Sequence, residues 1–253
     1  MNFPEGNAIV YCEGAFGTTN GKTAHGLVRR SDRYRVLSVV DSKQAGRDAG
    51  MILDGRKTGI PVVRSLHAAL TLAKSHNQEP THFVIGQAPD GGRLPKVARF
   101  DVLSALERGL NFDSGLHDFL ADDPEMAATA ERVGASIRDV RKPPPRDQLH
   151  LFSGKISEVK CLKVALLGTD SAVGKRTTAW LLKDALEERG WSTELVGTGQ
   201  TSWMQGAKFG IVVDSIVSDF VAGEIEHVVW TAWKETQPDV LLLEGQGSLM
   251  NPA

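Results

Sequence analysis

A glycine-rich loop between an apolar strand and an amphipathic helix constrains the fold of this chain more than any other feature. Residues Leu162–Leu167 are apolar except for Lys163, a composition typical of a strand at the centre of a parallel sheet. The loop Gly168–Gly174 follows, and Thr177–Arg189 then carries leucines at helical spacing before a stop at Gly190. Strand, glycine turn and helix in this order predict a parallel α/β domain.

The same loop has the composition of a phosphate-binding loop. Backbone N–H groups at the start of a helix point at an anion, and the helix dipole stabilises negative charge there. Lys175 adds a mobile positive charge. The alternative is a plain strand–helix turn with a surface lysine. We expect a phosphate-bearing ligand to contact the whole segment, which consists of Gly168, Thr169, Asp170, Ser171, Ala172, Val173, Gly174, Lys175, Arg176, Thr177 and Thr178.

The loop departs from the usual nucleotide-binding pattern at the metal position. Five residues, where the usual pattern has four, separate Gly168 from Gly174. Arg176 stands where a hydroxyl would bind Mg²⁺, and Thr177 is rotated from that position by about 100° on a helix. The sequence therefore predicts a cradle for a pyrophosphate without a bound metal. No histidine pair has metal-ligand spacing, so we expect no metal site elsewhere.

Two carboxylates follow predicted strands of the same half of the chain. Glu244 comes directly after Val240–Leu243, and Asp214 after Phe209–Val213. In parallel sheets the functional side chains gather at the carboxyl ends of strands. Glu244 is therefore the first catalytic candidate and Asp214 the second. The alternative for each is a carboxylate that caps the helix after the strand.

Polar residues after two strands are candidates for binding a substrate. Glycines permit close approach to a ligand, and hydroxyl and amide side chains can form hydrogen bonds with it. A surface loop is the alternative. The candidates after the predicted strand Glu194–Val196 are Gly199, Gln200 and Thr201, and those after Glu244 are Gln246 and Ser248.

Three consecutive prolines divide the chain. Pro143, Pro144 and Pro145 cannot continue a helix, and they form a stiff, extended spacer. Before them, predicted strands and helices alternate, as in a Rossmann-like fold: Ala8–Cys12, Lys22–Arg30, Arg35–Val40, Ile60–Val63, Leu66–Lys74, His82–Ile85 and Val97–Leu110. We predict a Rossmann-like domain over 1–141, a linker over 142–150 and a P-loop NTPase-like domain over 151–253. At about 150 residues per domain, a length of 253 residues predicts one large or two ordinary domains.

Composition narrows the function classes. Lys and Arg total 29 and Asp and Glu total 31, so no excess of positive charge favours nucleic acid or an anionic membrane. The 2 cysteines lie far apart in the sequence, which excludes a disulfide framework or a cysteine-rich metal site. The first residues lack the basic and apolar regions of a signal peptide, and no apolar run is long enough to span a bilayer. We expect a cytoplasmic protein that acts on a small molecule.

Five segments together resemble a known family. They are Lys22–Gly26, Gly168–Thr178, Gly197–Thr201, Asp214–Glu226 and Glu244–Ser248. They are similar to a bacterial and archaeal family that joins a Rossmann-like domain to a P-loop domain and includes the DgcN-type D-glutamate N-acetyltransferases. Members continue beyond the position of Ala253 with further strands and helices, so we expect the second domain of this chain to be incomplete. The P-loop part alone is also similar to dethiobiotin synthetase.

The resemblance implies an N-acetyltransferase that uses acetyl-CoA, and a homodimer. Glu244 would be the base and Asp214 its alternative, while backbone N–H groups of Gly245–Ser248 would stabilise the oxyanion. His25 lies in a matching segment, and either Arg176 or Arg29 would hold a substrate carboxylate. Two alternatives remain open. One is an enzyme of the dethiobiotin synthetase type that uses ATP with Mg²⁺, and the other is a regulator that binds a nucleotide without turnover.

Overall fold

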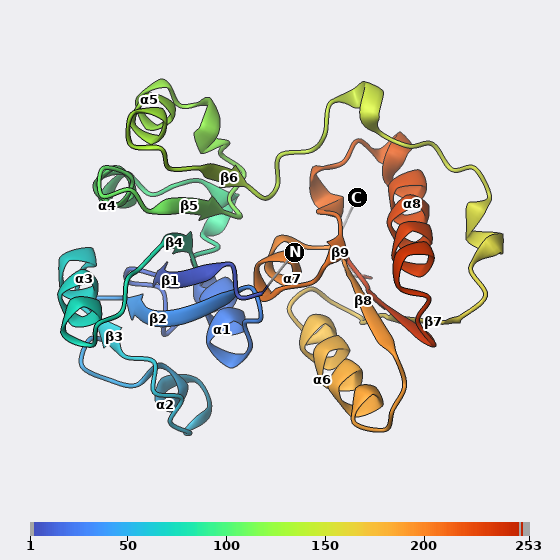
Figure 1. Ribbon diagram of the computed structural model, residues 1–253, viewed down its shortest axis with the longest axis horizontal. Coiled ribbons are helices and arrows are strands. Elements are labelled where there is room, and N and C mark those ends of the chain that lie inside the picture. Colours follow the sequence, from blue (N-terminus) through green and yellow to red (C-terminus); the bar gives the residue numbers. More distant parts are fainter. Residues whose placement is uncertain (1–2, 248, 250–253) are drawn as a thin grey trace. The chain divides into compact units, whose positions relative to one another are not determined.

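The computed structural model describes residues 3–247 and 249 and folds them as two units (Figure 1). Residues up to Arg141 form the first unit together with Met204–Gly206, and the other residues from Lys142 onward form the second. The elements of the first unit are β1 (Gly6–Tyr11), α1 (Lys22–Arg29), β2 (Tyr34–Val40), α2 (Ala49–Asp54), β3 (Val62–Val63), α3 (Leu66–Ser75), β4 (His82–Ile85), α4 (Lys96–Leu106), β5 (Asn111–Ser114), α5 (Pro124–Val133) and β6 (Ile137–Asp139).

Parallel strands build the sheet of the first unit. Over the described part of this unit their order is β3-β2-β1-β4-β5-β6. The order reverses between β1 and β4, as in doubly wound α/β folds. Ile9, Phe83 and Phe112 are fully buried on three neighbouring strands, and they share one core with side chains of α3, α4 and α5. The prediction of a Rossmann-like domain is confirmed.

The last third of this domain was not predicted from the sequence. Strand β5 reads Asn111-Phe112-Asp113-Ser114, so it lacks the apolar run of a buried parallel strand. Helix α5 has clear start signals, because Asp123 accepts hydrogen bonds from the N–H groups of Glu125 and Met126, and Pro124 occupies its first turn. The element was overlooked because its helical apolar pattern is short.

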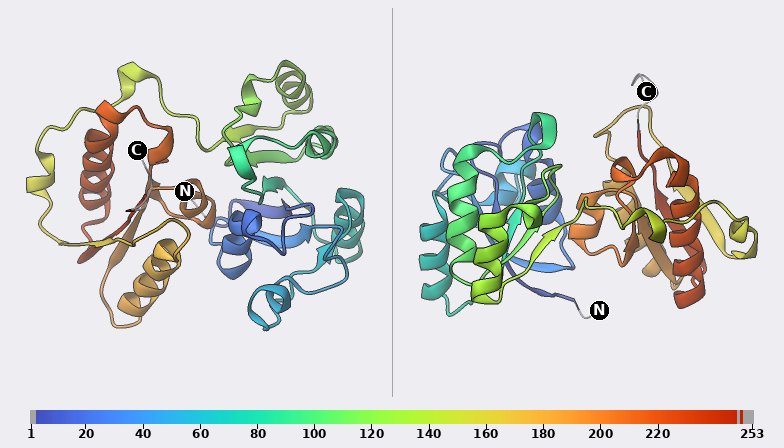
Figure 2. Two further views of the ribbon diagram at one scale, coloured as in Figure 1. Left: turned by 180° about the vertical axis from the view of Figure 1, so that it is seen from behind. Right: turned by 90° about the horizontal axis from the view of Figure 1, so that it is seen from above.

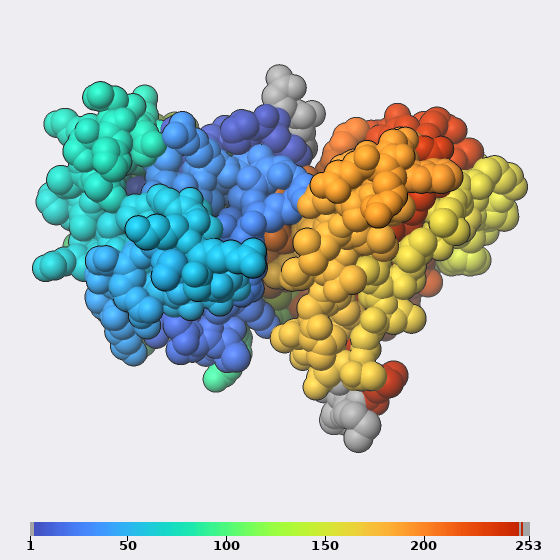
Figure 3. Space-filling view, turned by 90° about the horizontal axis from the view of Figure 1, so that it is seen from below, coloured from blue at the N-terminus to red at the C-terminus, as the bar shows by residue number. Residues whose placement is uncertain are grey.

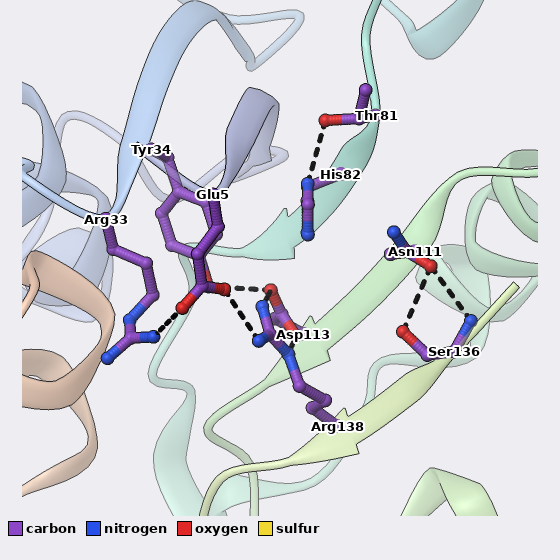
Figure 4. A network of polar contacts seen from close by, with 9 residues as sticks. All are labelled: Glu5, Arg33, Tyr34, Thr81, His82, Asn111, Asp113, Ser136 and Arg138. Atoms are coloured by element: carbon purple, nitrogen blue, oxygen red, sulfur yellow. Dashed lines mark hydrogen bonds and ion pairs between the residues drawn. The ribbon is translucent and has the colours of Figure 1, made fainter. Parts of the chain in front are cut away.

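A network of charged side chains joins four segments of the first unit, which contain Glu5, Arg33 and Tyr34, Asp113, and Arg138 (Figure 4). Arg33 is only 1% exposed and forms an ion pair with Glu5. Asp113 is completely buried, and its two carboxylate oxygens accept from Arg138 Nε at 2.5 Å and Nη2 at 2.7 Å. The hydroxyl of Tyr34 donates to the same carboxylate at 2.6 Å. The buried charges are therefore paired and hydrogen-bonded.

Burial changes the acid–base behaviour of this network. It raises the pKa of the Tyr34 hydroxyl well above its usual value, and the neighbouring Asp113 carboxylate raises it further. Burial lowers the pKa of His82, which is 6% exposed and whose Nδ1 lies 2.9 Å from the hydroxyl of Thr81. His82 is thus held in its neutral form.

The free energy of unfolding should fall as the pH is lowered below 6.5, the usual pKa of histidine, with His82 as one cause. The unfolded chain takes up a proton on His82 at a higher pH than the folded chain does, so acid favours the unfolded state. Urea unfolding between pH 7 and pH 5 measures the slope. The slope should be smaller in His82→Gln and unchanged in His67→Gln, which alters an exposed histidine. An equal slope in all three proteins would contradict this assignment.

The second unit is built around its own parallel sheet, with strands and helices alternating along the chain. Its elements are β7 (Leu162–Leu166), α6 (Lys175–Glu187), β8 (Thr193–Gly197), α7 (Gln200–Gln205, with its end in the first unit), β9 (Phe209–Gly210), α8 (Ser218–Thr236) and β10 (Val240–Glu244). Helices α6 and α8 lie on opposite faces of the sheet (Figure 2). Neighbouring residues of β10 alternate accordingly, since Leu241 packs with α8 and Leu242 with α6. The P-loop domain is confirmed.

The position of β7 in this sheet differs from the prediction. The strand order is β7-β10-β8-β9 within the described residues, so β7 is an edge strand there. Leu162 is 62% exposed as a result. Among the described residues, β10, the last strand in the sequence, pairs with both β7 and β8, and the predicted central position of β7 is not found there.

Residues 150–158, which we call the α8 strap, lie along helix α8. Glu224 accepts from the backbone N–H of His150 at 2.6 Å, and Glu226 accepts from that of Ser153 at 2.7 Å. Both glutamates are buried, so these hydrogen bonds satisfy charges that have little access to water. A Cβ atom on Gly223 would lie 2.0 Å from the carbonyl oxygen of His150, so only glycine permits this close contact.

Two further sequence predictions concern cysteines and membranes. Cys12 is buried and Cys161 half-buried, and both are free thiols, as predicted. Burial raises the pKa of the Cys12 thiol. Within residues 3–247, no helix is long and apolar enough to cross a membrane.

Candidate functional site

The carboxyl ends of three neighbouring strands bring the candidate site together. Leu166 at the end of β7 pairs with Glu244 at the end of β10, and Leu243 pairs with Val196 near the end of β8. The loop after β7, the carboxylate at the end of β10 and the turn after β8 therefore lie at one edge of the sheet. This edge collects predicted residues that are far apart in the sequence.

The loop after β7 has the backbone of an anion cradle. Ala172 and Gly174 both adopt left-handed conformations, with φ of 58° and 96°. Such turns direct successive N–H groups toward one point. Helix α6 begins at Lys175 without a side-chain cap, so the N–H groups of its first turn are available to a phosphate. The loop lies at the surface of its unit, where a ligand can reach it (Figure 3).

Lys175 lies across the opening of this cradle. Its Nζ donates to the carbonyl oxygen of Asp170 at 2.6 Å and to that of Gly247 at 3.1 Å. The amide of Leu249 also donates to the carbonyl of Thr169 at 3.0 Å. The segment after β10 thus runs beside the loop, and the ammonium group of Lys175 connects the two.

Glu244 is held in one orientation by its neighbours. Only 8% of its surface is exposed, and its Oε2 accepts from the Thr198 N–H at 3.0 Å and from the Ser202 hydroxyl at 2.5 Å. Thr198 also donates its hydroxyl to the backbone carbonyl of Glu244 at 2.8 Å. Oε1 forms no hydrogen bond with any described residue.

Two of the predicted substrate-binding residues, Gly199 and Gln246, lie near this carboxylate. A Cβ atom on Gly199 would lie 2.9 Å from Nε2 of Gln246, so the Gln246 side chain covers the glycine. Gln200 opens α7, while Thr201 is only 3% exposed and faces the interior. Ser248 lies outside the described residues. Their roles stay predictions.

The predicted oxyanion donors are partly occupied. The N–H of Gly245 donates to the carbonyl of Leu166 at 3.0 Å, which closes the ladder between β7 and β10. That amide cannot also stabilise an oxyanion. Among the described residues, the backbone N–H groups of Gln246 and Gly247 are the ones that remain as predicted oxyanion donors.

The remaining candidates lie in different surroundings. Asp214 is exposed in the short 3₁₀ turn Val213–Ser215. The N–H of Val213 in this turn donates a hydrogen bond to the carbonyl oxygen of Thr198 at 3.1 Å. Arg176 is half-buried in the first turn of α6, and Thr177 beside it is exposed. No group of three or more side chains among the described residues has the geometry of a metal site.

Two candidates belong to α1 of the first unit. One ring nitrogen of His25, Nε2, lies 2.7 Å from the carbonyl oxygen of Phe16 and donates to it. Arg29 forms a paired interaction with Asp54, at 2.7 and 2.9 Å for its shortest contacts. Each side chain has a structural partner, and its role toward a substrate stays a prediction.

Comparison with known proteins identifies the family. Residues 150–253 match a domain of unknown function described as the DUF1611 C-terminal P-loop domain, and residues 42–143 match the DUF1611 N-terminal Rossmann-like domain. The chain belongs to the DUF1611 family. The crystal structure of a DUF1611 family protein from Anabaena variabilis is similar, with a TM-score of 0.87 and 34% identity. The match covers 98% of this chain and 68% of that one.

Two DUF1611 relatives are named D-glutamate N-acetyltransferases. The protein from Tritonibacter scottomollicae is 35% identical over 184 residues, and that from a Pseudoalteromonas species is 33% identical over 171 residues. These matches cover 72% and 68% of this chain but 52% and 49% of the relatives. The chain thus matches about half the length of each.

The sequence placed Thr198 and Ser202 in a candidate stretch but did not predict that they hold Glu244. Thr198 and Ser202 stand in the polar stretch after β8, but Glu244 follows them by 46 and 42 residues. The available signal was the Gly-Thr-Gly turn after a buried strand. This turn predicts a position at the edge of the sheet, but it does not indicate which distant residue Thr198 and Ser202 contact.

Proposed function

We propose that this chain transfers an acetyl group from acetyl-CoA to the amine of D-glutamate. Glu244 carries the proposal, since it is a buried carboxylate with one oxygen held by two donors, at the same sheet edge as the anion cradle. Support also comes from the two relatives of 35% and 33% identity whose name states this activity.

The cradle fits the pyrophosphate of acetyl-CoA. The uncapped first turn of α6 and the left-handed residues Ala172 and Gly174 supply N–H donors, and Lys175 supplies a positive charge. Binding a pyrophosphate that is not cleaved requires no metal ion. This agrees with Arg176 at the position where a metal-binding hydroxyl would stand.

Acetyl-CoA supplies a thioester carbonyl that an amine can attack. The chain must then remove a proton from the substrate ammonium group, because only the neutral amine has a lone pair. We assign this step to Oε1 of Glu244, while Thr198 and Ser202 keep Oε2 fixed. A C–N bond forms, the C–S bond breaks, and the nitrogen loses a second proton. One of the two protons leaves on the thiolate as CoA, and the other passes to water. Arg176 is the candidate partner of a substrate carboxylate.

The direct test is incubation with acetyl-CoA and D-glutamate, followed by mass spectrometry for N-acetylglutamate. We expect product from D-glutamate and little from L-glutamate. Calorimetry should show that Lys175→Ala weakens acetyl-CoA binding by about tenfold or more, because a charge-assisted contact with phosphate is lost. Lys234→Ala, which alters an exposed lysine of α8, is the matched control. Absence of product together with Mg²⁺-dependent ATP hydrolysis would overturn the proposal.

A further inference from the structure

The first unit contains a cavity remote in sequence from all the residues assigned above. It has a volume of about 430 Å³ and lies between the amino half of β2, the segment before β3 and the carboxyl half of α3. A volume of this size is typical of small-molecule sites, which range from about 300 to 1,000 Å³.

The cavity exists because β3 is short. Strand β3 pairs only with Val39 and Val40, so the described residues place no strand beside the amino half of β2 on that side. The helix above contributes small side chains, Ala69 and Ala73, which are buried toward the sheet. The amino half of β2 lacks a neighbouring strand on this side, and the alanines of α3 above it are small. The side chains therefore leave a space that they do not fill.

The walls are apolar and carry polar groups that lack partners. Val36, Ile60 and Leu72 form part of the apolar lining. Arg35 also lines the cavity, and its guanidinium has no hydrogen bond or ion pair with any described residue. The hydroxyl of Ser38, in a residue only 2% exposed, is likewise unpartnered in the described chain. A buried hydroxyl without a partner is unfavourable, so Ser38 favours a ligand with polar atoms.

The charge of the lining selects one class of ligand. Arg35 is positively charged, and no Asp or Glu lines the cavity. We propose that this cavity binds a small organic carboxylate with an apolar body. The carboxylate pairs with Arg35, and the apolar body packs between the strand and helix α3. The test of this site measures ligand binding only, so its outcome does not depend on whether the chain transfers acetyl groups.

The probe is 3-phenylpropanoate, titrated into the full ¹⁵N-labelled chain and followed by NMR. We expect saturable shifts at residues 35–38, 58–61 and 69–78, with a Kd on the order of 1 mM for a ligand of this size. 3-Phenylpropan-1-ol, of the same shape without charge, should bind about tenfold more weakly. 3-Phenylpropylamine should not bind.

Two variants test the assignment. Arg35→Gln should raise the Kd about tenfold, because the lost contact is charge-assisted. Arg132→Gln, at an exposed arginine of α5, should leave it unchanged, and so should Lys175→Ala. Ala73→Leu fills the cavity and should abolish binding, with circular dichroism to verify its fold. Equal binding of acid and amine, shifts outside these segments, or an unchanged Kd in Arg35→Gln would overturn the proposal.

Discussion

Replacing Glu244 with glutamine should lower kcat/KM for acetyl transfer by about 10²- to 10⁴-fold, the range that a positioned general base contributes. Glutamine keeps the size of the side chain but cannot accept the proton of the substrate ammonium group. The hydrogen bonds from Thr198 and Ser202 keep one side-chain oxygen of residue 244 in place. The loss should therefore lie in the chemical step and leave acetyl-CoA binding unchanged.

Two other variants make this measurement decisive. Glu235→Gln alters an exposed carboxylate that pairs with Lys208 at 3.4 Å and should retain full activity. Asp214→Asn tests the second carboxylate, which lies exposed in a turn. Steady-state kinetics and calorimetry on all three variants separate turnover from binding. A large loss in Asp214→Asn with a normal rate in Glu244→Gln would transfer the role of base to Asp214.

Replacing Asp113 with asparagine should lower the free energy of unfolding by about 3–5 kcal/mol, the cost of breaking a buried ion pair from one side. Asp113 is completely buried and accepts both hydrogen bonds from Arg138 as well as the one from Tyr34. The asparagine amide has no negative charge. Glu5 would then be the one carboxylate left in the network to pair with both Arg138 and the buried Arg33. Urea unfolding followed by far-UV circular dichroism measures the change.

A second ion pair in the same unit is the matched control. Arg29 binds Asp54 through two nitrogens as well, but both side chains are nearly half exposed, at 43% and 45%. Asp54→Asn should cost less than about 1 kcal/mol, because water and salt screen an exposed pair. An equal loss in the two variants would show that burial of the Asp113 network has little energetic weight.

The arrangement of the second unit was predictable where short-range patterns determine it. The order of apolar strand, loop and helix at 162–189 identifies the P-loop domain, because each feature involves residues close in sequence. The sheet position of β7 was not predictable from the same residues. Apolar composition predicts burial, but it does not state which strands are neighbours, and β10 is about 75 residues away.

Buried polar residues were the other reason why parts of the structure could not be predicted from the sequence. Asp113 and Arg138 satisfy each other inside the first unit, so β5 and β6 lack the apolar runs by which strands are recognised. The hydrogen bond from Ser202 to Glu244 was not predictable either, because it joins segments that are distant in the sequence. The predicted homodimer and the bound acetyl-CoA stay predictions.

The α8 strap determines where the second unit begins as a folded body. Glu224 and Glu226 take their hydrogen bonds from residues 150–156, upstream of the first strand of the sheet. A polypeptide that began at residue 159 would lack the residues that donate hydrogen bonds to both carboxylates. In evolution, a gene fusion or a domain exchange that preserves this unit must therefore join it before His150, in the proline-rich stretch.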